Sequence, residues 1–276
     1  MDDYMKRQGL GPFKKRTRQP DFGMRVKHGY ISLALDHFKD AFFDKFGLVE
    51  KGRQTNAMVM FGLYNFMDWA MLREHRYPVI MVWCGSESKH LTPMKIRMLL
   101  TINHVKHIAT SRVISADLTR VGVAHELVPV SPAKMDIDPR PRGDKIYFYY
   151  GKPHARRFYG EPLAREVEKR TGLEVVYAAY NTYNREQLMD VYGDCFIGLR
   201  LTPRDGVSVT AVELGMMGRR VIFNGDTPSA IPWKGVDDIC ENVIKEYNNR
   251  HTDDTAQVSK QVKDYLDIGE KWLTWY

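Results

Sequence analysis

The sequence has few cysteines, no long apolar run and no internal repeat, and each absence excludes a class of protein. Its three cysteines, Cys84, Cys195 and Cys240, are odd in number and far apart, so neither a disulfide framework nor a zinc site is expected. No apolar run reaches the ~20 residues of a membrane-spanning helix. The first residues lack the apolar core of a secretory signal. We therefore expect a cytoplasmic protein with reduced thiols, in the host cytoplasm if the chain is viral.

The composition is that of a globular protein with an uneven charge. The 276 residues are 43% hydrophobic and 27% charged, which suits one large domain or two small ones. The formal charge is +7, and the first 30 residues hold eight Lys and Arg against three Asp. This basic arm is either a solvated tail or a means of capturing an anionic partner, which would be DNA or an anionic membrane surface.

Apolar, β-rich runs alternate with helix-period segments from about residue 57 onward, which predicts an α/β fold with parallel sheets covered on both faces. A stretch rich in proline and charge interrupts the alternation and reads as a linker, so two sheets are expected to face each other across a cleft. The expected parts are a basic arm at 1–21, a Rossmann-like domain at 22–131, the linker at 132–144, a second Rossmann-like domain at 145–253, and a C-terminal helix at 254–276 that crosses back.

The most informative stretch, 196–222, reads as a buried strand, a turn at 202–206, a helix and a final strand. The helix start brings backbone N–H groups, Ser208 and Thr210 near one point. A helix N-terminus with hydroxyl side chains is a suitable seat for a phosphate group. We therefore look for chemistry in this turn.

Two carboxylates flank the start of this helix. Asp205 precedes it and Glu213 lies two turns inside it. One carboxylate at the mouth of a cleft and one further along would suit two separate hydroxyl clusters, such as a sugar and a ribose. The alternative is an ordinary acidic cap followed by a surface glutamate.

The same residues carry a resemblance to a known family. Asp205 and Glu213 are separated by seven residues, Gly206 follows the first, and the second opens Glu-Leu-Gly-Met-Met-Gly-Arg-Arg-Val-Ile. This pattern resembles the nucleotide-sugar motif of the retaining GT-B glycosyltransferases of glycosyltransferase group 1, the family 4-like enzymes. The resemblance implies that Asp205, where glutamate is commoner, holds hydroxyls of the donor sugar and that Glu213 holds the ribose.

A second match is Tyr-Tyr-Gly-Lys-Pro-His-Ala-Arg-Arg at 149–157, where a strand ends and cations follow. It resembles the family element whose cations meet the donor diphosphate. The resemblance implies that Gly151 allows the turn and that Lys152 with Arg156 or Arg157 neutralises the leaving phosphate. The alternative is a basic loop facing water.

Two further turns follow strands. Asn181 and Tyr183 stand where the family contacts the nucleobase. In the N-terminal half, Gly85, Ser86 and Glu87 occupy a turn that in the family faces the reacting sugar, although Cys84 replaces the family's histidine. Gly85, Ser86 and Glu87 are therefore expected on the acceptor side.

The resemblance implies a GT-B enzyme that transfers a hexosyl or pentosyl group from a UDP-, GDP- or dTDP-sugar to an acceptor hydroxyl. Retention of configuration and no obligatory cofactor or metal are implied, with Asp205, Lys152 and Arg156 as catalytic residues. Asp136-Ile-Asp138 lies in the expected linker, so no metal site is predicted there.

The sequence does not decide which molecule is the acceptor of the sugar. It is either a hydroxymethylated base in DNA, as in phage-type DNA modification, or a surface or lipid-linked glycan, and the basic arm fits either. A non-catalytic nucleotide-sugar or nucleic-acid binding module on the same fold is the main alternative function. An NAD-type enzyme is disfavoured because no Gly-x-Gly-x-x-Gly follows an expected strand. Nothing in the sequence indicates an oligomeric state.

Overall fold

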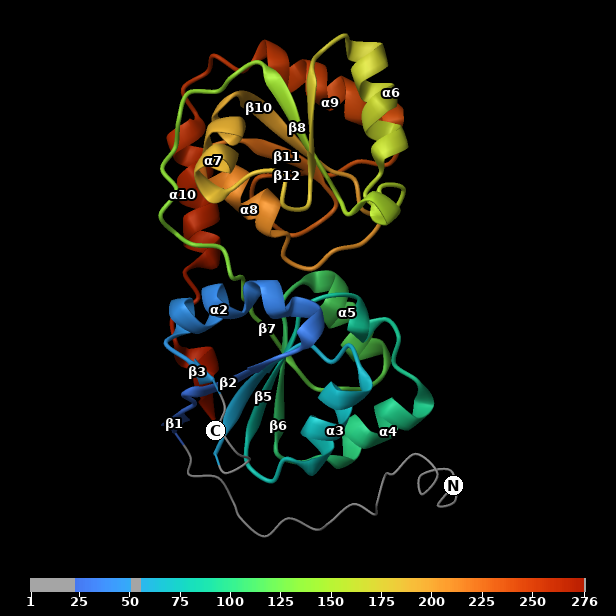
Figure 1. Cartoon of the computed structure of the whole chain (residues 1–276), viewed down its shortest axis with the longest axis vertical. Helices are drawn as coiled ribbons and strands as arrows, with labels where there is room; N and C mark the ends of the chain where they lie inside the picture. Colours follow the sequence, from blue (N-terminus) through green and yellow to red (C-terminus); the bar gives the residue numbers. More distant parts are fainter. Residues whose placement is uncertain (1–22, 51–55, 276) are drawn as a thin grey trace.

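The computed structural model describes residues 23–50 and 56–275, arranged as two α/β lobes. The basic arm predicted at 1–21 lies outside the described residues. Figure 1 shows the N-terminal lobe below and the C-terminal lobe above, with the turns after their strands meeting between them. No helix of the described part is long and apolar enough to cross a membrane.

The N-terminal lobe is built on a six-stranded parallel sheet in the order β3-β2-β4-β5-β6-β7. All residues of β4 and β5 are buried, because helices cover both faces of the sheet. The strands are β2 (His28–Ile31), β3 (Val49–Glu50), β4 (Met58–Phe61), β5 (Val79–Trp83), β6 (Val105–Ala109) and β7 (Glu126–Leu127). The helices are η1 (Leu33–Phe38), α2 (Lys39–Phe46), α3 (Phe66–Glu74), η2 (Ser86–Ser88), α4 (Pro93–Thr101) and α5 (Arg112–Arg120).

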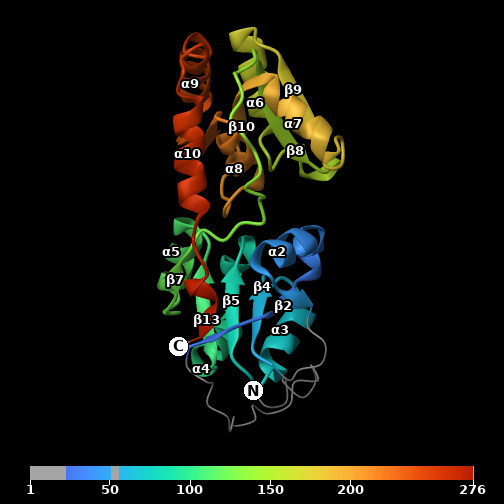
Figure 2. The same ribbon diagram turned by 90° about the vertical axis from the view of Figure 1, so that its left-hand side faces the viewer.

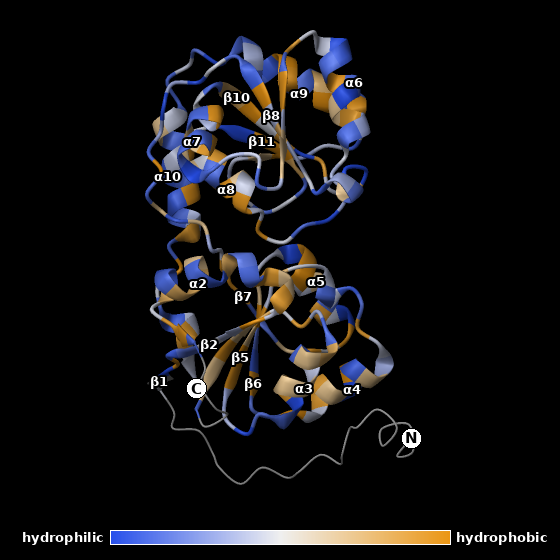
Figure 3. Cartoon of the chain, in the orientation of Figure 1, coloured by the Kyte–Doolittle hydropathy of each residue, from blue (hydrophilic) through white to orange (hydrophobic). Residues whose placement is uncertain are grey.

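The C-terminal lobe has a five-stranded parallel sheet in the order β12-β11-β10-β8-β9. Its central strand β10 is buried over most of its length, and Figure 3 shows apolar residues concentrated in strands such as β5 and β10. The strands are β8 (Lys145–Gly151), β9 (Val175–Ala179), β10 (Cys195–Arg200), β11 (Arg220–Phe223) and β12 (Ala230–Ile231). The helices are η3 (Pro153–Ala155), α6 (Glu161–Thr171), α7 (Arg185–Gly193), α8 (Val209–Met216), α9 (Val236–Asn248) and α10 (Thr255–Leu266).

Polar caps begin several of the helices that follow strands. Asn65 and Asn184 form capping boxes at α3 and α7, and the side chains of Ser111 and Ser208 accept from the first turns of α5 and α8. Each cap contributes about 1 kcal/mol. Because each cap follows a strand, these helix N-termini lie at the carboxyl ends of the sheets, which is the edge that faces the other lobe.

The end of the described chain returns to the N-terminal lobe. Helix α10 packs against α8 and ends at Leu266, whereas the sequence pattern predicts a C-terminal helix over 254–276. The tail then forms η4 (Lys271–Leu273) and β13 (Thr274–Trp275), which pairs antiparallel with β1 (Met24–Arg25). Trp272 lies in the N-terminal core, edge-on to Phe46 with ring centroids 5.0 Å apart. Figure 2 shows this path from α10 to β13.

One buried arginine fixes the linker to the C-terminal lobe. Arg219 is fully buried, and its guanidinium donates to the carbonyl oxygens of Arg140 at 2.7 Å, Pro141 at 2.6 Å and Gly193 at 3.0 Å. Burial lowers the pKa of Arg219 to about 10, so the group is still charged at neutral pH. Several hydrogen bonds to backbone carbonyls offset the desolvation of that charge.

A buried histidine makes the N-terminal lobe sensitive to acid. His107 on β6 accepts a hydrogen bond at Nδ1 from Trp83 Nε1 (3.2 Å), and burial, with a smaller contribution from His125, lowers its pKa from 6.5 to about 4. The unfolded chain binds this proton between pH 6.5 and 4 while the folded chain does not. The contribution of His107 to the free energy of unfolding is therefore present in full above pH 6.5. It is lost as the pH falls towards 4, which lowers the free energy of unfolding by about 3 kcal/mol.

We expect the urea midpoint, followed by tryptophan fluorescence, to decrease between pH 7 and pH 4.5 in the wild type. In His107→Asn the decrease should be shallower, because asparagine takes up no proton, even though the variant starts from a lower midpoint. Parallel pH profiles for the two proteins would contradict this assignment.

Candidate functional site

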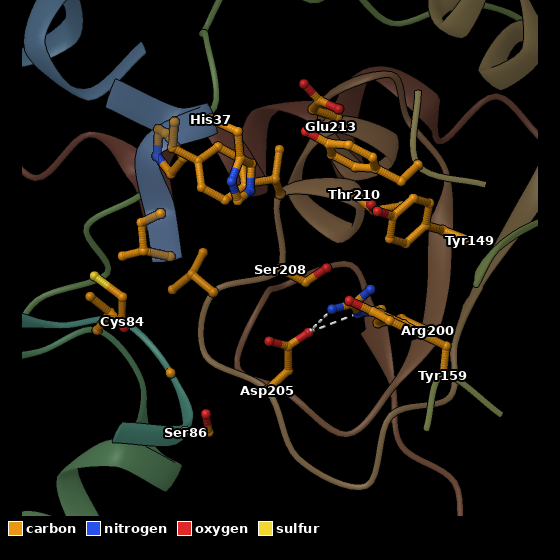
Figure 4. A pocket seen from close by; sticks show the side chains of 18 of the residues that line it. His37, Cys84, Ser86, Tyr149, Tyr159, Arg200, Asp205, Ser208, Thr210 and Glu213 are labelled. Carbon is orange, nitrogen blue, oxygen red and sulfur yellow. Dashed lines mark hydrogen bonds and ion pairs between the residues drawn. The ribbon is translucent and has the colours of Figure 1, made fainter. Parts of the chain in front are cut away.

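A pocket of about 680 Å³ lies between the lobes and is lined by residues of both. Figure 4 shows Cys84, Ser86 and His37 of the N-terminal lobe on one side and Arg200, Asp205 and Glu213 of the C-terminal lobe on the other. Eight of the residues predicted from the sequence line it. They are Gly85, Ser86, Asn181, Tyr183, Asp205, Ser208, Thr210 and Glu213.

The start of α8 faces the pocket. Ser208 caps the helix by accepting from Ala211 N at 3.3 Å, and both Ser208 and Thr210 line the pocket. The turn between β10 and α8 is therefore folded as the strand-turn-helix pattern predicts. It brings a helix N-terminus and two hydroxyl groups to one wall of the cavity.

Glu213 reaches the same cavity from inside the helix and is only 6% exposed. Its Oε1 accepts from Arg185 Nη1 at 3.2 Å and its Oε2 accepts from the Tyr192 hydroxyl at 3.2 Å. Burial raises the pKa of Glu213, and the charge of Arg185 acts against that rise. A buried carboxylate held by two donors at a pocket wall is a strong acceptor for sugar hydroxyls.

Asp205 lines the pocket as half of an ion pair that the sequence pattern does not reveal. Arg200, the last residue of β10, donates to Asp205 Oδ2 through Nε at 2.7 Å and also through Nη2. The other oxygen, Oδ1, accepts from Gly206 N at 2.9 Å. Sequence reasoning missed Arg200. The available signal is a cation at the end of a buried strand, five residues before the first motif carboxylate.

The cations after β8 lie outside the pocket lining. Lys152 Nζ is 5.3 Å from the ring of Tyr180, which does line the pocket, so Lys152 sits at its rim. Arg156 lies 4.7 Å over the ring of Tyr150 and 3.8 Å from Glu161. Arg157 is exposed.

Gly151, at the end of β8, has a φ of +68°. A Cβ there would lie 2.4 Å from the ring of Tyr159, so glycine lets this ring pack under the strand end.

On the N-terminal side, Gly85 and Ser86 face the pocket while the side chain of Glu87 is buried behind them. Glu87 Oε1 accepts from Cys84 N at 2.6 Å, and burial raises the pKa of the Glu87 carboxyl. Tyr64 and His37 also line the pocket, and the sequence pattern gave no reason to select them.

The two lobes touch directly beside the pocket. Arg204, next to Asp205, forms an ion pair with Asp117 of α5 and donates to Ser88 Oγ at 3.4 Å. A Cβ on Gly206 would lie 2.4 Å from the carbonyl oxygen of Cys84, so only glycine fits this contact. The β10–α8 turn and the turn after β5 therefore hold each other in place.

No protein-family model and no curated protein sequence matches the chain. Solved structures do match. Sucrose-phosphate synthase from Thermosynechococcus elongatus gives a TM-score of 0.56 at 11% identity, over 87% of this chain and 73% of that one. A glycosyltransferase from Rickettsia africae gives a TM-score of 0.52 at 8% identity, over 98% and 84%.

A complex of S. aureus TarM with UDP gives a TM-score of 0.55 at 11% identity, over 86% of this chain and 57% of that chain. The chain thus spans little more than half the length of TarM. At such identities the similarity establishes the fold. The predicted class is confirmed: the protein has the GT-B fold, with two Rossmann-like domains facing across a cleft.

Whether the Arg204–Asp117 ion pair holds the two lobes together can be tested by mutation. Asp117 pairs with Arg204 across the cleft and also with Arg120 inside the N-terminal lobe, at 3.5 Å. Arg204→Ala should increase the radius of gyration measured by small-angle X-ray scattering, because it removes a contact that holds the lobes together. Arg120→Ala, which removes an ion pair from the same carboxylate, should leave the scattering unchanged. Equal scattering from both variants would show that Arg204 does not hold the lobes closed.

Proposed function

We propose that this protein is a glycosyltransferase that takes a sugar from a nucleotide-sugar donor bound in the pocket between its lobes. The observation that carries the proposal is that Glu213 and the start of α8 line one interlobe cavity, at the spacing of the nucleotide-sugar motif. The GT-B fold and the presence of UDP in the similar TarM structure support it.

Each part of the donor has its own place on the wall of the pocket that the C-terminal lobe forms. Glu213 binds the ribose hydroxyls, because its carboxylate lies deepest along α8 and is held by two donors. The diphosphate lies at the start of α8, near Ser208 and Thr210, where backbone N–H groups favour negative charge. Asn181 and Tyr183, which line the pocket after β9, face the base.

The sugar then lies towards the N-terminal lobe, near Asp205. Lys152 at the rim is placed to approach the diphosphate when donor is bound, with Arg156 and Arg157 further out. Gly85 and Ser86 form the acceptor side, and Glu87 supports that turn from behind. In this scheme the reaction proceeds with retention and without an obligatory metal, as in the family that the motif resembles.

The acceptor hydroxyl belongs either to a hydroxymethylated base in DNA or to a surface or lipid-linked glycan. The basic arm favours a polyanionic surface in both cases, because Lys and Arg clusters bind phosphate groups. Binding to duplex DNA that weakens steeply with salt would favour the first, and binding to anionic vesicles without DNA binding would favour the second.

The ribose contact is tested by a conservative change. Glu213→Gln should weaken binding of UDP, GDP or dTDP, whichever the wild type binds, about tenfold or more, because a charge-assisted hydrogen bond contributes about 1.5–3 kcal/mol. Isothermal titration calorimetry measures this change. Glu246→Gln is the matched control, since Glu246 is also a buried glutamate beside an arginine, Arg220, but lies on α9 outside the pocket lining.

Equal affinities for wild type and Glu213→Gln would contradict the ribose assignment. Incubation with the corresponding nucleotide-sugars separates the enzyme from a non-catalytic binding module, because release of the sugar from any of them requires catalysis. Failure of the wild type to bind any of the three nucleotides would overturn the proposed function itself.

A further inference from the structure

The strand end at Arg200 is built to hold a guanidinium in one position. The side chain is 11% exposed and lines the pocket. Its guanidinium lies 4.7 Å from the ring of Tyr159 and 5.9 Å from that of Tyr149, both of which also line the pocket. Two rings and a buried strand restrict the rotamers of Arg200, so its hydrogen-bonding groups are fixed before any ligand arrives.

The ion pair with Asp205 uses only part of this guanidinium. Asp205 accepts from Nε and Nη2, and within the described residues Nη1 makes no hydrogen bond. Burial is the largest single influence on the pKa of Arg200 and lowers it, but the charge and hydrogen bond of Asp205 together with Tyr159 and Tyr149 outweigh burial, so the pKa is raised. The arginine therefore stays charged, with its Nη1 amino group left for another acceptor.

Asp205 is the more fully occupied partner. Its Oδ2 accepts two N–H groups from Arg200 and its Oδ1 accepts the N–H of Gly206. The carboxylate thus orients the guanidinium and fixes the turn that leads to Ser208. Figure 4 shows Arg200 between Asp205 and the start of α8, beside Ser208.

Other cations are less well placed for an anion in the pocket. Arg204 is engaged with Asp117 of the opposite lobe, and Arg185 with Glu213 and Asp136. Lys152 lies at the rim, outside the lining residues. Arg200 is the arginine that lies next to the α8 start, where the proposed function puts the diphosphate.

We propose that Arg200 is a catalytic residue that contacts the donor diphosphate and stabilises its charge as it leaves. The assignment rests on the proposed function and adds to it a residue outside the motif. In the transfer step the bond between the anomeric carbon and the β-phosphate oxygen breaks, and its electron pair passes to that oxygen. The acceptor oxygen bonds to the anomeric carbon, and its proton leaves with the nucleoside diphosphate. Arg200 Nη1 donates to the phosphate oxygen on which the charge grows.

The test compares a nucleoside diphosphate with its nucleoside, because only the first carries the charge that Arg200 would contact. UDP with uridine, GDP with guanosine and dTDP with thymidine are titrated by calorimetry, and the pair that the wild type binds is used. In Arg200→Gln the diphosphate should bind about 10- to 100-fold more weakly while the nucleoside changes less than about twofold. Arg200→Lys keeps the positive charge but lacks the planar guanidinium with its several N–H donors. It should therefore give an intermediate loss of diphosphate affinity.

Arg250→Gln is the matched control for the loss of an arginine stacked on a tyrosine. Arg250→Gln removes another arginine stacked on a tyrosine, Tyr247 at 3.8 Å, outside the pocket lining, and should change neither affinity.

A loss in Arg200→Gln that is shared equally by diphosphate and nucleoside would overturn the assignment. No change in Arg200→Gln would overturn it as well. In each of these cases the wild type still binds nucleotide, so the proposed function stands. A wild type that binds no nucleoside diphosphate overturns both.

Discussion

The pocket depends on the contact that holds the carboxyl ends of two parallel sheets face to face. Each sheet places its turns and helix N-termini at that edge, and neither wall alone encloses a ligand. Arg204 crosses from the β10–α8 turn to Asp117, and Gly206 packs on the backbone of Cys84. Because these residues flank Asp205, the contact between the lobes and the shape of the β10–α8 turn are set by the same few residues.

Much of the fold follows from sequence patterns that act locally. Buried strands such as β4 and β5 are continuous apolar runs, and α3, α4 and α5 open with Asn, Thr and Ser caps, respectively. The spacing of Asp205 and Glu213 placed both on one strand-turn-helix unit, and both line the pocket. Because the turn between β10 and α8 is short, the spacing of these two residues in the sequence largely determines where they lie in the structure.

The features that the sequence did not reveal are those that need long-range packing. The environment of Arg200 is made by Tyr149 on β8, Tyr159 before α6 and Asp205 after β10, which only the sheet order brings together. The role of Arg219 in fixing the linker depends on carbonyls 26 to 79 positions away in the sequence. The sequence pattern also did not predict that α10 ends at Leu266, because the helix ends there so that the tail can bury Trp272 in the N-terminal lobe.

The pairing of β1 with β13 has a consequence for synthesis of the protein. The N-terminal lobe takes part of its core from Trp272, Leu273 and Trp275, which follow the C-terminal lobe in the chain, whereas the C-terminal lobe between the linker and α10 is contiguous in sequence. Domains ordinarily fold in the order in which the ribosome makes them. Here the lobe that is translated first stays incomplete until the other has been made, so the pocket between the lobes can form only after both have emerged from the ribosome.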